Sequence, residues 1–211
     1  MVHFDAHLDY RPFVHGVQWA NGNPIRNVAK LATVGSIVQV GIRSLRTRQA
    51  DVLDSRARGN DILTVPEYRR RGPSGVLERL PRGEPVYVSI DIDVLDLPLV
   101  PGCASAEVNG LSYDELRQAL FAIARHAEVV GFDLVEVNPM LDVASENTSL
   151  IAAPGADRRA SAVPATSPRP SRPARGSETA GPSRLPAAAP RRAGLAAAWQ
   201  EAMNARGPRP V

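Results

Sequence analysis

The feature of this sequence that most restricts its fold is the regular alternation of short apolar runs and amphipathic segments along residues 1–153. Short apolar runs that are rich in β-branched residues predict buried strands. The expected strands are Val2–Leu8, Ser36–Ile42, Asp61–Val65, Val86–Val94 and Glu128–Val137. Strands that alternate with helices build a mostly parallel sheet with helices on both faces. The sequence therefore predicts an α/β fold with three layers, α/β/α.

The strongest predicted helix begins at Ser112, which has the spacing of a capping box with Glu115. A second helix is expected after Asn23, a favoured cap residue, with Pro24 at its first position. Buried positions should recur at helical spacing on each of them. For the Ser112 helix these are Leu116, Ala119, Leu120, Ile123 and Ala124. For the Asn23 helix they are Ile25, Val28, Ala29 and Ala32.

Two weaker patterns complete the helices of residues 1–153. Thr47 is expected to cap a helix that Gly59 ends. A further helix is expected around Ser74–Leu80. The apolar positions of the Thr47 helix are Ala50, Leu53 and Ala57.

The composition changes abruptly near Pro154. Residues 154–211 contain ten arginines and only three acidic residues, so this part carries about +7, whereas residues 1–153 carry about −4. A string rich in Arg, Pro and Ala with few bulky aliphatic residues cannot bury enough apolar surface to fold alone. We therefore predict one α/β domain over residues 1–153 and a disordered tail over residues 154–211. A nucleic-acid contact by this tail is the less favoured alternative to a solvated coil.

Several classes of protein are disfavoured by simple features. The longest apolar runs fall well short of the roughly 18 residues that predict a membrane span, and the first residues lack the pattern of a signal peptide. Cys103 is the single cysteine, so no internal disulfide can form. These features predict a cytoplasmic protein without a membrane partner.

Acidic residues mark the ends of two predicted strands. Asp5, His7 and Asp9 occupy every second position at the end of the first strand, and Asp91 and Asp93 do so in the fourth. Residues two apart share a face of an extended chain. If the two strands are neighbours, their side chains converge at the shared carboxyl edge, which is where such folds place their sites.

That convergence predicts bound cations, because four carboxylates in one cleft repel each other and take up protons. Two divalent ions would balance their formal charge. Oxygen ligands with a single imidazole and no thiolate favour manganese over a structural zinc. Two such ions roughly 3.5–4 Å apart activate a shared water near neutral pH. The alternative is structural, since Asp-x-Asp at a strand end also serves as a turn or a helix cap.

Three motifs resemble, in order, the signatures of the ureohydrolase family, which includes arginase and agmatinase. They are Asp-Ala-His-Leu-Asp (5–9), Ser-Ile-Asp-Ile-Asp-Val-Leu-Asp (89–96) and Gly-Phe-Asp-Leu-Val-Glu-Val-Asn-Pro-Met-Leu-Asp (131–142). The segment over residues 101–116 is similar to that of agmatinase-like members. The likeness extends from Val2 to about Ile151.

This resemblance implies a binuclear manganese enzyme that hydrolyses a guanidinium group, of agmatine or a similar compound, to urea and an amine. Asp5 and Asp91 would bridge both ions. His7 and Asp93 would complete one of them, and Asp9 would help to hold the other. The resemblance further implies that Glu136 receives the substrate guanidinium and that the chain forms a homo-oligomer, because relatives form trimers or hexamers.

The sequence departs from the family pattern in three places. No segment matches the family's Gly-Gly-Asp-His, whose histidine is the remaining ligand of the ion that Asp9 helps to hold; His3, His15 and His126 are expected to be structural or exposed. Asn21 occupies the position of the histidine that is thought to shuttle protons. The family pattern also stops near residue 153. The alternative is therefore a truncated, non-catalytic remnant or pseudoenzyme that retains partial metal binding.

Overall fold

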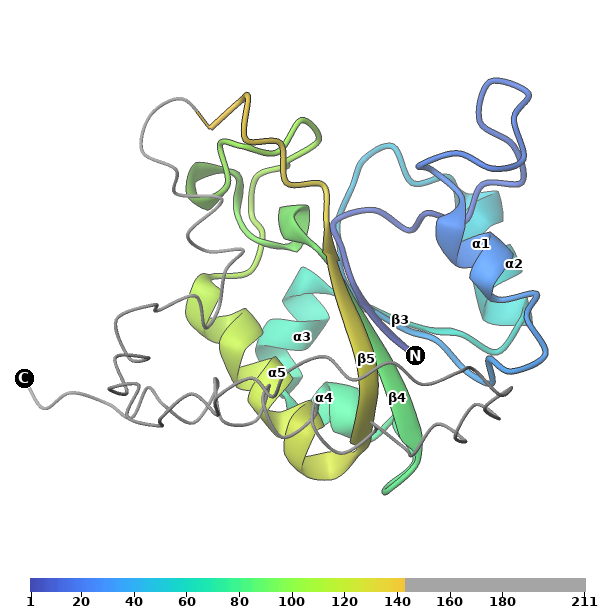
Figure 1. Ribbon diagram of the computed structural model, residues 1–211, viewed down its shortest axis with the longest axis vertical. Helices are drawn as coiled ribbons and strands as arrows, with labels where there is room; N and C mark the ends of the chain where they lie inside the picture. The colour runs from blue at the N-terminus through green and yellow to red at the C-terminus, as the bar shows by residue number, and fades with distance from the viewer. Residues whose placement is uncertain (143–211) are drawn as a thin grey trace, which may run out of the picture.

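The computed structural model describes residues 1–142 and contains a single parallel sheet within them (Figure 1). Its order is β3-β2-β1-β4-β5, and every neighbouring pair is parallel. The strands are β1 Val2–Phe4, β2 Val38–Ile42, β3 Asp61–Thr64, β4 Pro85–Asp91 and β5 Glu128–Val135. The prediction of a parallel α/β fold is confirmed. The predicted tail over residues 154–211 lies outside the described residues.

Helices cover both faces of the sheet, as the sequence predicts for three layers. In Figure 1, α3, α4 and α5 lie on one side of the strands, whereas α1 and α2 lie on the other. The helices are α1 Pro24–Val28, α2 Gln49–Ala57, α3 Val65–Arg71, α4 Ser74–Leu77 and α5 Tyr113–His126, and two 3-10 turns follow β4 at Ile92–Val94 and Leu97–Leu99. Within residues 1–142 no helix has the length and apolarity needed to cross a membrane.

Each helical layer encloses its own apolar cluster. The larger one lies under α3, α4 and α5, and it includes Phe4 of β1, Val40 of β2 and Ile123 of α5, all fully buried. The smaller one packs α1 against the opposite face through Ile25, Ala29 and other residues. Burial of each such side chain contributes roughly 1.5–3 kcal/mol, so the larger cluster holds most of the described fold together.

Helix α5 follows its sequence pattern closely. Ser112 Oγ accepts a hydrogen bond from the backbone N–H of Glu115 at 3.1 Å, and the Glu115 carboxylate accepts one from the Ser112 N–H at 2.7 Å. This is the predicted capping box. Four of the five predicted apolar positions, Leu116, Ala119, Leu120 and Ile123, are buried, and Ala124 is half-buried.

The predicted apolar face of α2 is wrong. Leu53 is 58% exposed, and Ala50 and Ala57 also face solvent. The helix instead buries Asp51 and Ser55, because the Ser55 hydroxyl donates a hydrogen bond to Gln39 Oε1 of β2 at 2.9 Å. Val52, which the pattern did not include, makes the apolar contact of this helix with the smaller cluster. The helix also begins after Arg48, so Thr47 does not cap it.

Two further helix predictions need correction. Asn23 precedes α1 as predicted, but its side chain accepts a hydrogen bond from the Ala20 N–H instead of capping, and the helix ends at Val28. Helix α3 was missed entirely. Its signal was present, since Thr64 accepts a hydrogen bond from the Glu67 N–H, three residues on, and Pro66 lies in the first turn.

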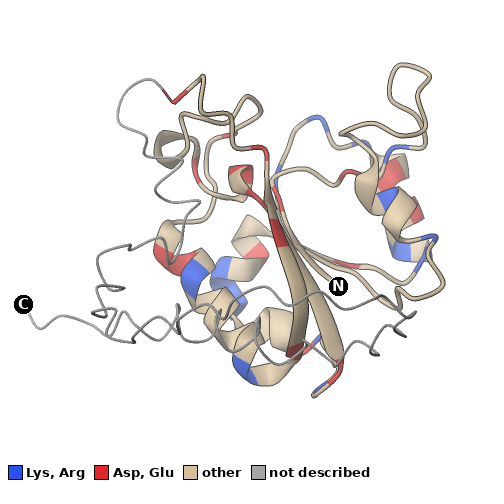
Figure 2. Cartoon of the chain, viewed as in Figure 1, with Lys and Arg blue, Asp and Glu red and all other residues tan. Residues whose placement is uncertain are grey.

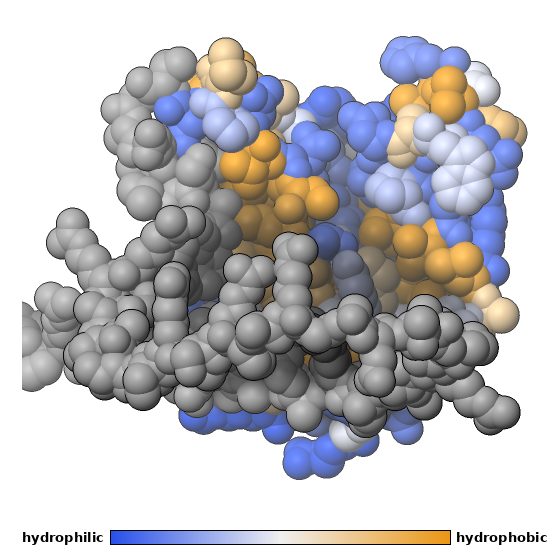
Figure 3. Space-filling view, in the orientation of Figure 1, coloured by the Kyte–Doolittle hydropathy of each residue, from blue (hydrophilic) through white to orange (hydrophobic). Residues whose placement is uncertain are grey.

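Within the described residues, one side of the sheet is incompletely covered. Strand β5 forms the edge, and its apolar side chains Val130, Phe132 and Val135 are 43–49% exposed. A groove of about 880 Å³ runs between α1 and the outer strands, and its lining includes Ile25 and Val86. Figure 3 shows apolar residues gathered around this hollow. The groove reaches as far as Asp9 and Asp91.

We expect Gly41→Ala to destabilise the protein far more than Gly59→Ala. Both glycines have positive φ, +99° and +89°, so a side chain at either costs about 1–2 kcal/mol. An added Cβ at Gly41 would also lie 2.6 Å from Val94 Cγ2, whereas one at Gly59 meets nothing within 4 Å. The overlap should cost about 1–3 kcal/mol more. Urea unfolding measures both values, and equal losses would contradict the close approach at Gly41.

Candidate metal centre

Two equivalent turns position the acidic residues of this site. Asp5 Oδ1 accepts a hydrogen bond from the His7 N–H at 2.5 Å, and Asp91 Oδ1 accepts one from the Asp93 N–H at 3.0 Å. An aspartate that binds the backbone two residues on forms an Asx turn. Each turn begins where its strand ends, β1 at Phe4 and β4 at Asp91.

These turns correct the reason for the convergence. The sequence predicts that Asp5, His7 and Asp9 share a face of a strand, but β1 ends before all three. The side chains meet because β1 and β4 are parallel neighbours, so the two turns lie side by side. The Ala6 N–H also donates a hydrogen bond to Asp93 Oδ1 at 3.0 Å, which joins them. Asp5 and His7 thus meet Asp93 at the carboxyl edge, by turns and not by the pleat of a strand. Asp9 belongs to neither group of potential ligand atoms found among the described residues.

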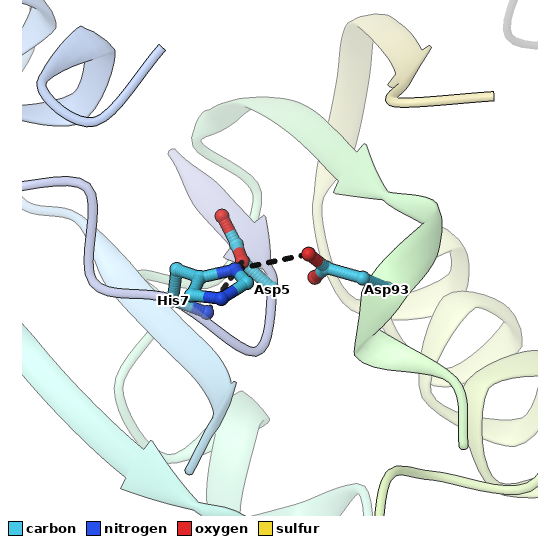
Figure 4. A group of neighbouring side chains, drawn as sticks. All are labelled: Asp5, His7 and Asp93. Carbon is cyan, nitrogen blue, oxygen red and sulfur yellow. Dashed lines mark hydrogen bonds and ion pairs between the residues drawn. The ribbon is translucent and has the colours of Figure 1, made fainter. Parts of the chain in front are cut away.

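Asp5, His7 and Asp93 point toward one another in Figure 4. His7 Nδ1 lies 2.9 Å from Asp93 Oδ2 and 3.3 Å from Asp5 Oδ1. One ligand atom from each residue lies within 4.8 Å of the others. Both carboxylates are almost fully buried, whereas His7 is 18% exposed. The spacing allows one divalent ion to contact all three side chains.

A second group adjoins the first through Asp93. It consists of Asp91, Asp93 and Cys103, whose potential ligand atoms also lie within 4.8 Å of one another. The Ser105 hydroxyl donates a hydrogen bond to Asp93 Oδ2 at 3.1 Å. Burial raises the pKa of the Cys103 thiol, which therefore stays protonated and is a poor ligand. No pattern in the sequence pointed to Cys103 or Ser105, because both lie on a loop after β4.

The electrostatics of the site favour a bound cation. Burial and the negative charge of Asp5 raise the pKa of Asp91 to about 10 and that of Asp9 to about 7. Burial alone would lower the pKa of His7, but hydrogen bonds to Asp5 and Asp93 raise it to about 11. The site therefore holds protons in place of positive ions near neutral pH. Figure 2 shows acidic residues gathered where the central strands end.

One buried oxygen tests whether the donor set suits a metal. His3 Nε2 lies 3.0 Å from Asp5 Oδ2 as an ionic contact, yet this oxygen accepts no hydrogen bond. Burial opposes the charge of Asp5, but the neighbouring His3 outweighs it and lowers the pKa of Asp5, so the carboxylate is ionised. An ionised, buried oxygen with a free lone pair suits a hard divalent ion. The residues present therefore fit the ion that the sequence predicts.

The remaining predicted residues line a cavity of about 290 Å³ next to these turns. Asp9, Asn21 and Glu136 contribute to its wall, together with His7 and Asp91. Asp9 and Glu136 have positive φ values of 51° and 62°. Such backbone costs about 1–3 kcal/mol per residue and is concentrated at functional sites. Five of the predicted residues thus line one cavity, and Asp5 and Asp93 adjoin it through their contacts with His7.

The other histidines have separate environments. His3 is buried behind Asp5, His15 is exposed on a turn with a φ of 49°, and His126 Nε2 lies 3.0 Å from the Leu80 carbonyl oxygen. None of the three is among the described residues that line the 290 Å³ cavity. Fold and site together are those of an α/β protein with a carboxylate-rich cleft at the carboxyl edge of its sheet.

Comparison with known proteins places the chain within a family. The sequence profile described as Arginase family matches residues 1–157. The chain belongs to the arginase family, whose members with solved structures share its fold.

Two curated relatives and one solved structure give the range of similarity. The chain is 37% identical to the agmatinase of Halalkalibacterium halodurans over 156 residues, which cover 72% of this chain and 51% of that protein. It is 34% identical over 160 residues to the formimidoylglutamase of the same organism. The structure of proclavaminate amidinohydrolase from Streptomyces clavuligerus matches with a TM-score of 0.63 and 33% identity, covering 72% of this chain and 51% of that one. The chain spans about half the length of these relatives.

We expect Mn²⁺ to stabilise the protein more as the pH rises from about 5 to 8. The raised pKa values of Asp9 and Asp91 mean that both hold protons in the metal-free fold at the acidic end of this range. Their protonation stabilises the metal-free fold below about pH 4, and this contribution is lost as the pH rises toward the raised pKa values. A cation replaces those protons, so its binding strengthens as they leave.

Melting temperatures at pH 5, 6.5 and 8, with Mn²⁺ or with EDTA, test this expectation. The difference between the two conditions should grow at each step. A difference that stays constant or shrinks with rising pH would contradict a carboxylate-held cation.

Proposed function

We propose that this chain carries the metal centre of an agmatinase-like binuclear manganese amidinohydrolase. Asp5 and Asp91 would bridge two ions, His7 and Asp93 would complete one, and Asp9 would help to hold the other. The observation that carries the proposal is the meeting of Asp5, His7 and Asp93 ligand atoms within 4.8 Å, at the carboxyl edge of an arginase-family sheet.

The ions, when bound, would lower the pKa of a water so that it can act as a nucleophile near neutral pH. The chain's own residues would position the substrate. A carboxylate that accepts two parallel N–H bonds holds a guanidinium in a fixed plane. Glu136 suits this task, because it lines the same cavity as His7 and Asp91, which come from two separate segments. A cavity of about 290 Å³ suits a small guanidino compound such as agmatine.

At position 21 this chain lacks the histidine that the family pattern uses to transfer a proton to the leaving amine. Asn21 lies on the cavity wall where the family pattern has histidine, and a carboxamide neither holds nor releases a proton near neutral pH. In this proposal the amine takes its proton from solvent. Turnover would then be slower than in a relative with histidine at this position.

A second candidate is a non-catalytic member that retains partial metal binding. The observation that favours it is Asn21 on the cavity wall, where the family pattern has histidine. Among the described residues the proposed ligands of the second ion are Asp9 and the bridging carboxylates, which include no imidazole, so this ion would bind more weakly than the first. We further propose a cytoplasmic homo-oligomer, in line with the family.

The two candidates separate in one set of measurements. Mn²⁺ stoichiometry by titration should be two per chain for the enzyme and fewer for the remnant. Urea release from agmatine, with arginine and guanidinobutyrate as alternatives, should accompany only the first. Asp93→Asn should abolish Mn²⁺ stabilisation, while the exposed Asp54→Asn should leave it unchanged. Binding that survives Asp93→Asn would contradict the proposed centre.

We expect Glu136→Gln to lower kcat/KM for agmatine about 100-fold without changing Mn²⁺ affinity. An amide can accept only one of the two N–H bonds and presents no charge, which amounts to roughly 3 kcal/mol for a charge-assisted pair. Steady-state urea assays measure the first quantity and titration the second. Equal losses of metal binding and turnover would place Glu136 among the ligands instead.

We expect Asn21→His to raise kcat about 10- to 100-fold and to make it depend on pH near 6.5. A neutral-pH proton donor typically contributes a factor of 10²–10⁴ to such a step, and histidine titrates in this range. The pH profile of urea release measures the change. A flat profile with unchanged kcat would show that proton delivery by residue 21 does not limit the rate.

A further inference from the structure

Glu107 lies on the far side of His7 from the two buried aspartates. His7 Nδ1 faces Asp5 and Asp93, whereas His7 Nε2 lies 3.3 Å from Glu107 Oε1. The two ring nitrogens therefore meet carboxylates on opposite sides. Glu107 belongs to the loop before α5, outside the acidic motifs of the sequence.

The two nitrogens take different roles once a cation is bound. A metal ligated by Nδ1 leaves the ring's remaining proton on Nε2, and that N–H then needs an acceptor. A carboxylate acceptor fixes the tautomer and the ring plane, and it makes the ligating nitrogen more basic. Glu107 Oε1 is in position for this role without any movement of the ring.

The Glu107 carboxylate is itself held in place. The Ser44 hydroxyl donates a hydrogen bond to its Oε1 at 2.7 Å, and Arg46 Nη2 donates one at 3.1 Å. Its backbone carbonyl accepts a hydrogen bond from Arg43 Nη2 at 2.7 Å, and the same guanidinium group donates to the Asp93 carbonyl at 2.8 Å. Arg43 thus ties the Glu107 loop to the turn that carries a candidate ligand.

Arg46 competes for the same ring nitrogen. Its Nη2 lies 3.0 Å from His7 Nε2, where it can donate only if that nitrogen carries no proton. With a metal on Nδ1 and the proton on Nε2, Arg46 can donate only to Glu107. Glu107 then accepts hydrogen bonds from both His7 and Arg46, and its negative charge lies between these two donors.

We infer that Glu107 is a positioning residue, which orients His7 for metal binding through Nε2 and is held in place by Ser44, Arg43 and Arg46. The inference rests on the proposed metal centre, since it assigns an outer partner to one of the proposed ligands. It adds a residue to which the sequence analysis assigns no role, and it explains why a loop far along the chain is anchored beside β1.

Titration of Mn²⁺ into Glu107→Gln tests the inference, with the exposed Glu128→Gln as the matched control. The glutamine keeps the size of the side chain but loses its charge. Loss of such a partner typically weakens metal binding about 10- to 100-fold, and we expect this loss for Glu107→Gln and none for Glu128→Gln. Ser44→Ala, which frees the carboxylate without removing it, should give a smaller loss of about 3- to 10-fold.

A second readout separates positioning from a general effect on folding. In the Zn²⁺-loaded chain, nitrogen NMR of His7 should show Nδ1 bound to metal and a proton on Nε2. Glu107→Gln should expose that proton to faster exchange with water, while the melting temperature in EDTA changes little. Equal Mn²⁺ affinity and equal exchange in Glu107→Gln and the unsubstituted chain would overturn the role of Glu107 alone. Absence of Mn²⁺ binding by the unsubstituted chain would overturn the proposed centre, and this inference with it.

Discussion

The structure depends on one electrostatic constraint, the crowding of buried carboxylates at the carboxyl edge of the sheet. Asp5, Asp91 and Asp93 are all less than a tenth exposed, and burial together with the negative charge of Asp5 raises the pKa of Asp91. Like charges in a low-dielectric setting must be neutralised by protons or cations. The metal-free chain does so with protons on Asp91 and His7. Divalent ions are the alternative that would leave the carboxylates free for chemistry.

Strand pairing and two turns bring these carboxylates together. Parallel pairing of β1 with β4 brings two strand ends together, and an Asx turn at each end aims the ligands across the gap. Arg43 then fastens the surrounding loops by donating to backbone carbonyls, including those of Asp93 and Glu107. The residues with positive φ, Asp9 and Glu136, lie at the same cleft, and such backbone is concentrated at functional sites.

Several expectations from the sequence hold because they depend on local physics or on strong patterns. The Ser112 capping box and the stripe of α5 involve residues within a few positions of each other. The parallel sheet follows from strands that alternate with helices. The failures lie where distant contacts decide. Leu53 was expected to be buried, but the Ser55–Gln39 hydrogen bond turned the other side of α2 inward. Helix α3 was missed although Thr64 and Glu67 carried its signal.

The sequence by itself determined the class of fold, the family and the residue types that meet at the cleft, because motif spacing and hydrophobic period are local properties of a chain. Only the tertiary structure decided how these residues meet. It replaced a shared strand face by two turns, and it brought Cys103 and Ser105 beside Asp93, and Glu107 beside His7. The physical reason is that strand order and loop path set distances between residues far apart in sequence, and no periodicity within a short window encodes those distances.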